Sequence, residues 1–407
     1  MLGVQLTASL NNDVFELSWP EVWARRVARH YLDVPARPAQ MANVVGVIGG
    51  IHAQVMASAE LSVGLRVRGA TSHSVREAIW PSRDLVRISS LRGTIHLLPA
   101  REAKTWLAAL RARPDSGSGW TLESLGVRAE MMDRLVDSIC NALQNGPLTR
   151  AQLDHALAQE LGAWVHETRF PGFGGTMPVW RLAAGEAMVR GLICYGPGQS
   201  SNTTLALMPA LTTEKPSLAG PAALAWVARR FLTAFGPATH RDFAAWLNTK
   251  ASHAKEVFDS LGDEIEKVSV EGWKAWQLHG EQTIWSVLET VHLLPHFDTF
   301  IVACRPRERL VPWNLEHLFA KRMPSRLQSA ARHHDVKSIP TLLVNGTVAG
   351  IWERKRSGAR MALTIEPFGR LTTPQLDLLD QAANRVGEVF GSEVTWKFGR
   401  VDIRPHL

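Results

Sequence analysis

Gly146-Pro-Leu-Thr-Arg-Ala-Gln-Leu-Asp-His-Ala-Leu157 returns later in the chain as Gly236-Pro-Ala-Thr-His-Arg-Asp-Phe-Ala-Ala-Trp-Leu247. The two stretches share a Gly-Pro-x-Thr start and the apolar positions that follow it. Thr149 and Thr239 are natural N-cap residues, and apolar residues follow each of them at helical spacing. The repeat therefore predicts two short helices, each beginning after a tight turn.

The surroundings of the two copies are also alike. Each copy follows a longer amphipathic segment and precedes a further helical stretch and two apolar strands. The predicted longer helices span residues 122–143 and 221–234, and the predicted strands span residues 191–195, 204–207, 264–270 and 273–278. Helix, turn, helix, helix and hairpin is the order of a winged helix-turn-helix unit, so we expect two such units.

The N-terminal part shows a similar order of elements without the Gly-Pro-x-Thr start. Helices are expected at residues 19–31, 38–47 and 75–80, and a hairpin at residues 85–90 and 94–98 around Leu91-Arg-Gly93. This third, divergent unit is predicted from element order alone.

The C-terminal part is instead rich in strand signals. Residues 341–352 predict a hairpin around Asn345-Gly346, which is a preferred type I′ turn. A second turn at Arg354-Lys-Arg-Ser-Gly358 is expected to return the chain into a strand at residues 361–365. The tip of this second turn carries the densest basic cluster in the protein.

These patterns predict an α+β, mainly helical fold of tandem winged helix-turn-helix units with a C-terminal β-rich element. A chain of 407 residues is too long for one ordinary core, and its hydrophobic content of 45% with 20% charge is typical of globular proteins. The expected divisions are residues 1–118, 119–215, 216–290 and 291–407.

The cysteines and the apolar runs bear on where the protein works. Cys140, Cys194 and Cys304 lie far apart with no CxxC spacing, so we expect neither a disulfide framework nor a thiolate zinc site. No apolar run approaches the roughly 20 residues of a membrane span, and no secretion signal begins the chain. We expect a cytoplasmic protein with no membrane partner. Without a heptad repeat, a monomer is also expected.

Positive charge is concentrated in one stretch of the chain. The net charge is +7, and residues 300–360 hold twelve Lys or Arg against four acidic residues. A phosphate backbone requires such a surface, because neutralising phosphates releases counterions. A solvated basic face is the alternative interpretation.

His52-Ala53-Gln54 is the main candidate for chemistry. It lies in the apolar, glycine-containing run of residues 47–58. In an extended backbone the side chains of residues i and i+2 point the same way, so His52 and Gln54 are positioned to hold one water together. The alternative is that both side chains only satisfy nearby backbone groups.

The other motifs give weaker evidence for a chemical function. The chain has no GxxxxGK[ST] phosphate loop, HExxH or GxSxG motif, and the glycines of residues 46–50 and 172–175 match no dinucleotide fingerprint. His292-Leu-Leu-Pro-His296 with Asp298 has the look of a metal cluster, but Pro295 would break a helix there and favours a structural turn. His333-His334-Asp335 is expected at a basic helix end. We predict no metal and no cofactor.

In five blocks the chain resembles the AlkZ/YcaQ-like family of bacterial winged-helix DNA glycosylases. The blocks occur in the family's order. They are His52-Ala53-Gln54, Leu91-Arg-Gly-Thr-Ile-His-Leu-Leu-Pro99, the Gly-Pro-x-Thr starts, Leu293-Leu-Pro-His-Phe-Asp298 and Val344-Asn-Gly-Thr-Val-Ala-Gly-Ile-Trp352. The first block corresponds to the family's catalytic Gln/His-Φ-Gln/Asp motif. Its best-known members have Gln where this chain has His52.

The resemblance implies tandem winged helices in a C-shaped arrangement, with the motif on the concave face toward double-stranded DNA that carries alkylated purines. It implies His52 and Gln54 as catalytic residues, and the His-Φ-Gln form resembles a branch acting on bulky N7-guanine adducts. The implied reaction is monofunctional hydrolysis of the N-glycosidic bond, in some members as self-resistance to a DNA-alkylating natural product.

This chemistry suits the residues. N7-alkylation makes guanine cationic and already a good leaving group, so the remaining task is to hold a water against C1′. His52, expected to titrate near neutrality, is also able to accept the proton of that water.

The DNA contacts are expected outside the motif. Arg92, Arg354, Lys355 and Arg356 are predicted to grip phosphates, while Thr94 and His96 are predicted to line the approach, with ordinary strand packing as their alternative. The competing function is a non-enzymatic winged-helix DNA-binding protein such as a regulator. A metal-dependent nuclease would need an acidic cluster that the sequence does not offer.

Overall fold

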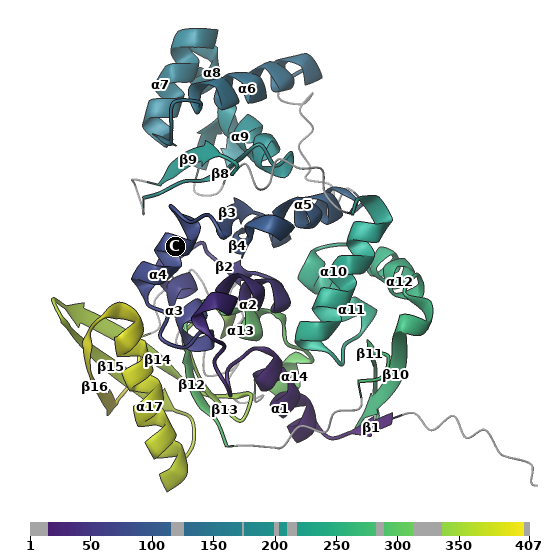
Figure 1. Cartoon of the computed structure of the whole chain (residues 1–407), viewed down its shortest axis with the longest axis vertical. Helices are drawn as coiled ribbons and strands as arrows, with labels where there is room; N and C mark the ends of the chain where they lie inside the picture. The colour runs from purple at the N-terminus through teal and green to yellow at the C-terminus, as the bar shows by residue number, and fades with distance from the viewer. Residues whose placement is uncertain are drawn as a thin grey trace, which may run out of the picture.

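The computed structural model describes residues 15–114, 126–172, 175–198, 203–209, 218–281, 289–311 and 336–402. Helices and strands both recur along these residues, which confirms the predicted α+β class (Figure 1). In the described part of the chain, no helix is long and apolar enough to cross a membrane.

The N-terminal elements contain the predicted helices and hairpin. They are β1 (Phe15–Leu17), α1 (Trp19–Arg29), α2 (Met41–Val47), β2 (Ile51–His52), α3 (Met56–Arg66), α4 (Ser72–Ile79), β3 (Leu85–Ser89), β4 (Ile95–Pro99) and α5 (Ala103–Arg111). Strands β3 and β4 pair antiparallel, which confirms the predicted hairpin. Helix α3, which begins two residues after Gln54, was not predicted.

The second group of elements surrounds the first copy of the repeat. It comprises α6 (Ala129–Ala142), β5 (Leu148–Thr149), α7 (Arg150–Leu161), α8 (Trp164–Glu167), β6 (Arg169–Gly172), β7 (Gly175–Pro178), α9 (Trp180–Val189), β8 (Ile193–Tyr195) and β9 (Thr204–Leu207). Thr149 caps α7 by accepting a hydrogen bond from the backbone N–H of Gln152 at 3.3 Å, as predicted. The prediction for residues 122–143 was wrong at its start, because Gly126 has a positive φ of 70° and α6 begins only at Ala129.

The third group surrounds the second copy. It comprises α10 (Gly220–Phe235), α11 (His240–Leu247), α12 (Ala251–Asp259), β10 (Ile265–Val270) and β11 (Trp273–Leu278). Thr239 caps α11 through the N–H of Asp242. The two copies also pair alike, since Leu148 lies opposite Leu205 in the second group and Ala238 lies opposite Trp276 in the third.

Of the C-terminal elements, β14, β15, β16 and α17 form the lower left of Figure 1, while β12, β13, α13 and α14 lie nearer the centre. They are β12 (Val291–Leu294), α13 (Thr299–Ala303), α14 (Arg307–Leu310), β13 (Thr341–Val344), β14 (Thr347–Ser357), β15 (Arg360–Pro367), α17 (Thr373–Phe390) and β16 (Glu393–Phe398). Asn345 and Gly346 have φ of 51° and 78°, which confirms the predicted tight turn.

The predicted turn at Arg354-Lys-Arg-Ser-Gly358 was wrong in position. Strand β14 continues to Ser357, which lies opposite Arg360 of β15, so the basic cluster occupies the strand and the reversal follows it. In β15, Met361, Leu363 and Ile365 are buried while Arg360 and Ala362 are exposed, which is the alternation of a strand that pairs regularly as far as Arg360.

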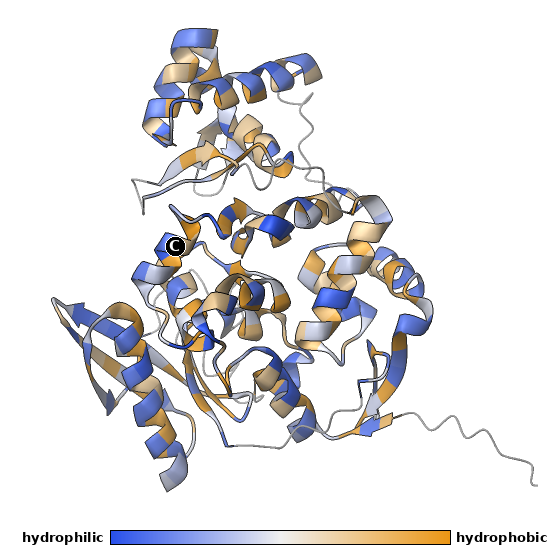
Figure 2. Ribbon diagram, in the orientation of Figure 1, coloured by the Kyte–Doolittle hydropathy of each residue, from blue (hydrophilic) through white to orange (hydrophobic). Residues whose placement is uncertain are grey.

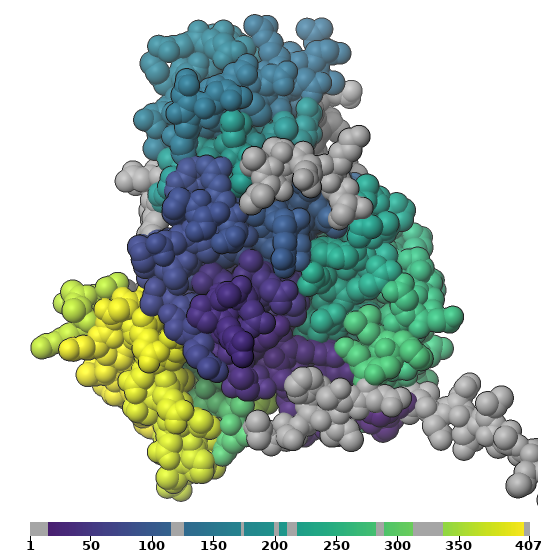
Figure 3. Space-filling model, in the orientation of Figure 1, coloured from purple at the N-terminus to yellow at the C-terminus, as the bar shows by residue number. Residues whose placement is uncertain are grey.

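Sheets join segments that lie far apart in the sequence. The six-stranded sheet has the order β2-β4-β3-β8-β9-β5 and so links the N-terminal hairpin to the second group, while β1 pairs with β10 of the third group. Residues 126–207 nevertheless form a distinct upper part of the molecule (Figure 3) and have a core cluster of their own. The four-way division of the chain remains a prediction.

The helices pack through one face. In Figure 2, helix α10 alternates between hydrophobic and hydrophilic colour along its length. Its buried side chains recur at three- and four-residue spacing, at Leu224, Val227, Phe231 and Phe235. These rings and aliphatic chains belong to the largest core cluster, which runs from Leu17 to Val401.

A buried ion pair ties α3 to the start of α13. Asp298 accepts two hydrogen bonds from the guanidinium of Arg66, at 2.7 and 2.9 Å, and one from the Ser62 hydroxyl at 2.7 Å. Both charged side chains have no exposed surface. The charge and hydrogen bonds of Arg66 outweigh the effect of burial and lower the pKa of Asp298.

We expect Asp298→Ala to destabilise the protein by about 3–5 kcal/mol, because the charge of Arg66 would remain buried without its partner. Urea unfolding followed by circular dichroism measures this. Asp133→Ala is the matched control, since Asp133 pairs with Arg190 at the same 2.7 Å on the surface, and it should cost less than about 1 kcal/mol. Equal costs for the two variants would contradict the assignment.

Candidate functional site

His52 ends the short strand β2, opposite His96 of β4. The chain reaches this position through Gly49 and Gly50, which have φ of 76° and 89°. These φ values favour glycine, and a Cβ at Gly50 would also lie 2.7 Å from a methyl carbon of Leu98 and 3.3 Å from the carbonyl oxygen of Leu97. Gly49 and Gly50 thus allow the backbone to bring the motif against the sheet.

The backbone of the motif is held on both sides at Ala53. Its N–H donates to the carbonyl of Ile95 at 2.7 Å, and its carbonyl accepts from Nε of Arg87 at 3.2 Å. Arg87 is itself buried on β3 with its guanidinium over the ring of Tyr195. Arg87 was not predicted as a site residue. The sequence feature that points to it is a single arginine within an apolar strand.

His52 and Gln54 differ in their surroundings. His52 is only 8% exposed, whereas Gln54 is exposed in a bend between β2 and α3. Strand β2 ends at His52, and a bend follows at Gln54 instead of a strand through the whole motif. The motif has an inner imidazole and an outer carboxamide.

The imidazole of His52 packs between two rings. The ring of Phe297 lies 4.7 Å away, centroid to centroid, and that of His96 lies 5.3 Å away at a near right angle. Among the described residues, Nδ1 of His52 is buried without a hydrogen-bond partner. A buried donor or acceptor left unpaired is costly, and at a candidate site it marks a place for a ligand or water.

The expectation that His52 titrates near neutrality was wrong. Burial, together with the charge of Arg92, lowers the pKa of His52 to about 4. At neutral pH the ring is uncharged, so it offers one acceptor and one donor nitrogen.

Arg92, Thr94 and His96 form one hydrogen-bonded group beside His52. The Nδ1 of His96 lies 3.1 Å from the carbonyl of Thr94, and its Nε2 lies 3.3 Å from a guanidinium nitrogen of Arg92. Because Arg92 only donates, these contacts identify His96 as the neutral tautomer with its proton on Nδ1. Burial lowers the pKa of His96 well below its ordinary value.

Further contacts of Arg92, Thr94 and His96 bear on the roles predicted for them. Arg92 also donates to the carbonyl of Trp246 at 2.8 Å, and Thr94 donates to that of Leu91. His96 is buried, so it supports His52 from within the sheet. Phosphate contact by Arg92 remains a prediction.

Phe297 is the aromatic neighbour that sequence reasoning missed. It has a φ of 58°, a conformation rarely adopted by bulky residues, and its N–H donates to the carbonyl of Lys337. The next residue is Asp298, fixed by the buried ion pair. The loop is therefore held on both sides with the Phe297 ring against His52. The only sequence signal for this residue was its place in residues 293–298, one of the blocks that carry the family resemblance.

The same stretch contains the histidine pair that was considered as a metal cluster. His292 lies on strand β12, His296 contacts the carbonyl of Ser338 at 2.8 Å, and Asp298 is engaged by Arg66. The turn predicted after Pro295 is present at residues 296–297. No group of three or more His, Cys, Asp or Glu in the described ranges is arranged to hold a metal ion. His333-His334-Asp335 lies outside those ranges.

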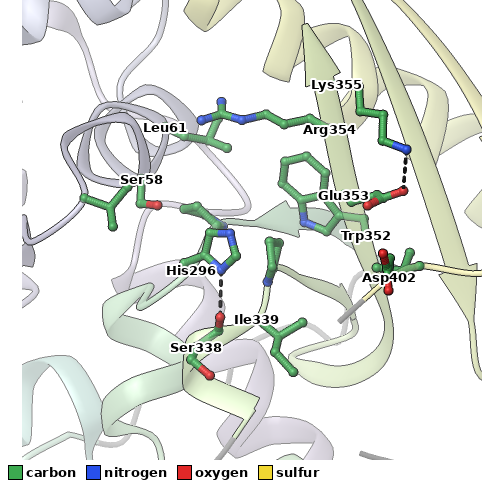
Figure 4. Close-up of a pocket in the computed structure, with 14 residues that line it drawn as sticks. Ser58, Leu61, His296, Ser338, Ile339, Trp352, Glu353, Arg354, Lys355 and Asp402 are labelled. Carbon is green, nitrogen blue, oxygen red and sulfur yellow. Dashed lines mark hydrogen bonds and ion pairs between the residues drawn. The ribbon is translucent and has the colours of Figure 1, made fainter. Parts of the chain in front are cut away.

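Arg354, Lys355 and Arg356 follow one another on β14. The guanidinium of Arg354 packs over the ring of Phe390 at 4.1 Å, and burial lowers the pKa of Arg354. Lys355 and Arg356 are exposed. Arg354 and Lys355 border a cavity whose wall also includes Val55, the residue after Gln54, so the structure brings two of the three basic residues toward the motif (Figure 4).

Comparison with known proteins agrees with this arrangement. A family model described as DNA glycosylase AlkZ-like matches residues 45–389. The chain belongs to the AlkZ-like family of DNA glycosylases. The match includes the motif, the His96 strand, the Phe297 loop and the basic strand.

A curated protein and a solved structure each match most of the AlkZ-like chain. An interstrand DNA cross-link repair glycosylase of Streptomyces sahachiroi is 29% identical over 356 residues, which is 83% of this chain and 88% of that protein. The solved structure of Streptomyces sahachiroi DNA glycosylase AlkZ matches with a TM-score of 0.74 and 25% identity, covering 95% of this chain and 100% of that one. This membership favours the enzyme over the non-enzymatic DNA-binding protein.

We expect acid to destabilise this AlkZ-like chain through its buried histidines. The pKa of His52 and of His292 is lowered to about 4, from an ordinary value near 6.5. Between about pH 6.5 and 4, these two histidines are therefore protonated in the unfolded chain but neutral in the folded chain. The free energy of unfolding decreases as the pH falls through this range.

Thermal unfolding at pH 7.5, 6.0 and 5.0 measures the loss. His292→Phe should flatten the dependence, whereas His73→Gln, which changes a surface histidine, should leave it unchanged. A variant His292→Phe with the full wild-type loss would refute this explanation.

Proposed function

We propose that this enzyme hydrolyses the N-glycosidic bond of bulky N7-alkylguanine, or a related alkylpurine, in double-stranded DNA. The observation that carries the proposal is a neutral, buried His52 whose Nδ1 has no partner among the described residues, two residues before an exposed Gln54. Such a pair is suited to binding a water from two directions.

The proposed reaction needs little acid or base. An N7-alkylguanine leaves as a neutral base, so the transition state develops positive charge on the sugar rather than on the leaving group. His52 accepts a hydrogen bond from the attacking water, and Gln54 orients that water with its carbonyl oxygen. A pKa of about 4 makes His52 a weak base, so we assign it hydrogen bonding and not proton abstraction. As the bond from the water oxygen to C1′ forms and the neutral base leaves, the proton that the water loses passes to solvent.

The substrate class draws on the relative from Streptomyces sahachiroi. Because that protein is named an interstrand DNA cross-link repair glycosylase, we extend the proposal to cross-linked purines. We further propose that the lesion is made by a DNA-alkylating natural product and that the enzyme serves self-resistance. The protein acts as a monomer on DNA in this proposal.

The DNA-binding frame of the proposal consists of winged helix-turn-helix units in a C-shaped arrangement. The capped helices α7 and α11, and the pairing of Leu148 and Ala238 with the outer strand of each hairpin, support this assignment. The basic residues of β14 then contact phosphates, with Arg92 and Thr94 nearer the lesion.

Substitutions at His52 separate its two possible roles. We expect His52→Gln to keep activity within about tenfold, because glutamine also offers an acceptor, and His52→Leu to lose on the order of a hundredfold or more. Gln54→Ala should lose a similar amount. The measurement is alkali-induced cleavage at abasic sites after incubation with duplex DNA that carries N7-methylguanine or a bulky N7 adduct.

His73→Gln is the control, since its ring is exposed and distant in sequence from the motif. Binding to undamaged DNA and the melting temperature show that each variant is folded. An inactive His52→Gln together with a rate that falls below pH 7 would establish His52 as a general base instead. Wild-type activity in all three motif variants would refute the assigned site.

The basic strand is tested through salt dependence. We expect Lys355→Ala/Arg356→Ala to reduce the slope of log affinity against log salt by about 1.8, since each neutralised phosphate contributes about 0.9. Arg354 is left unchanged because its packing on Phe390 gives it a structural role as well. Fluorescence anisotropy with a duplex at several salt concentrations measures the slope.

Arg229→Ala serves as the control, because Arg229 is neutralised by Glu264 at 2.6 Å. It should leave the slope near the wild-type value. If the double variant has the wild-type slope, Lys355 and Arg356 do not contact phosphates.

A further inference from the structure

A cavity of about 380 Å³ lies between helix α3 and strand β14. Figure 4 shows Ser58 and Leu61 of the helix on one side, and Trp352 and Glu353 of the strand on the other. Ile339 and His296 lie between them. The volume falls within the range of about 300–1,000 Å³ that is typical of small-molecule sites.

The walls of this cavity are mainly apolar. Leu61, Ile339, Trp352 and Val401 all line it and are each buried in the folded chain. The indole N–H of Trp352 is satisfied by the carbonyl of Leu294 at 2.9 Å. The cavity therefore meets the apolar ring of Trp352, and its indole donor is not available to a ligand there.

Charged groups gather at one side of the cavity. Arg354 and Lys355 lie beside it, with Glu353 3.6 Å from the ammonium group of Lys355 and with Asp402 nearby. These two cations belong to the strand for which we propose phosphate contacts. A duplex bound there would run along the mouth of the cavity.

The cavity adjoins the catalytic motif from two directions. Val55, which follows Gln54 directly, forms part of its wall. Pro295 and His296 form another part, and the next residue, Phe297, packs against the ring of His52. A group bound in the cavity is thus near the motif without occupying the position of the attacking water.

We propose that this cavity binds the apolar, ring-containing substituent carried by the alkylated purine. The inference rests on the proposed function. Guanine N7 lies on the major-groove edge of the base, away from the sugar, so a substituent there needs a space separate from the residues at C1′. The cavity offers that space with walls that favour apolar rings over charged chains.

Filling the cavity tests the inference. Ile339→Trp adds bulk inside it, and Ile339→Leu keeps the volume as a matched control. Both are assayed on duplexes carrying 7-benzylguanine or 7-methylguanine. We expect Ile339→Trp to lower the ratio of kcat/KM for the benzyl lesion to that for the methyl lesion by about tenfold or more. Ile339→Leu should keep the wild-type ratio.

A wild-type ratio in a folded Ile339→Trp variant would overturn the inference while leaving the glycosylase function intact. Wild-type protein that excises neither lesion would instead refute the proposed function.

A binding measurement decides the inference independently of catalysis. The free base 7-benzylguanine is titrated into the wild-type protein by calorimetry, with 7-methylguanine as the comparison. We expect the benzyl base to bind about tenfold more tightly, and Ile339→Trp to remove the difference. Equal affinities of the wild type for the two bases would overturn the inference even if the variant fails to fold.

Discussion

The buried pair of Arg66 and Asp298 is the interaction on which the site depends. It fixes the C-terminal end of helix α3 to the loop that carries Phe297, across 232 positions of sequence. The N-terminal end of the same helix lies two residues after Gln54. Helix α17 packs on the C-terminal half of α3, where a Cβ at Gly64 would lie 2.4 Å from Val389. One helix therefore aligns the motif, the aromatic loop and the wall of the cavity.

Charge is arranged around this helix in a consistent order. The imidazoles of His52 and His96 are neutral at the centre, because burial lowers the pKa of each. Arg92 approaches His96, and its charge also disfavours a proton on the imidazoles. The exposed cations Lys355 and Arg356 lie on the strand at the edge. Such an order attracts a polyanion to the surface while the two imidazoles at the proposed reaction site stay uncharged.

Local sequence signals predicted local structure well. The Thr149 and Thr239 caps, the β3–β4 hairpin and the Asn345-Gly346 turn each depend on a few neighbouring residues, and each was correct. Contacts across long separations were not predictable in this way. Phe297 meets His52 only because the loop is anchored by Arg66, and no periodicity links those positions. The pKa of His52 was misjudged for the same reason, since its burial comes from residues outside the motif.

The depth of His52 bears on how a histidine compares with the glutamine that the resemblance implies at this position in other members. A histidine near its ordinary pKa would differ from glutamine by its ability to take a proton. With its pKa at about 4, His52 shares with glutamine what matters at neutral pH, an uncharged side chain with an acceptor and a donor. A leaving group activated by N7-alkylation makes little demand on base strength. The proposed role of the first motif residue is then to orient water, and the rigid backing of Phe297 and His96 fixes that orientation.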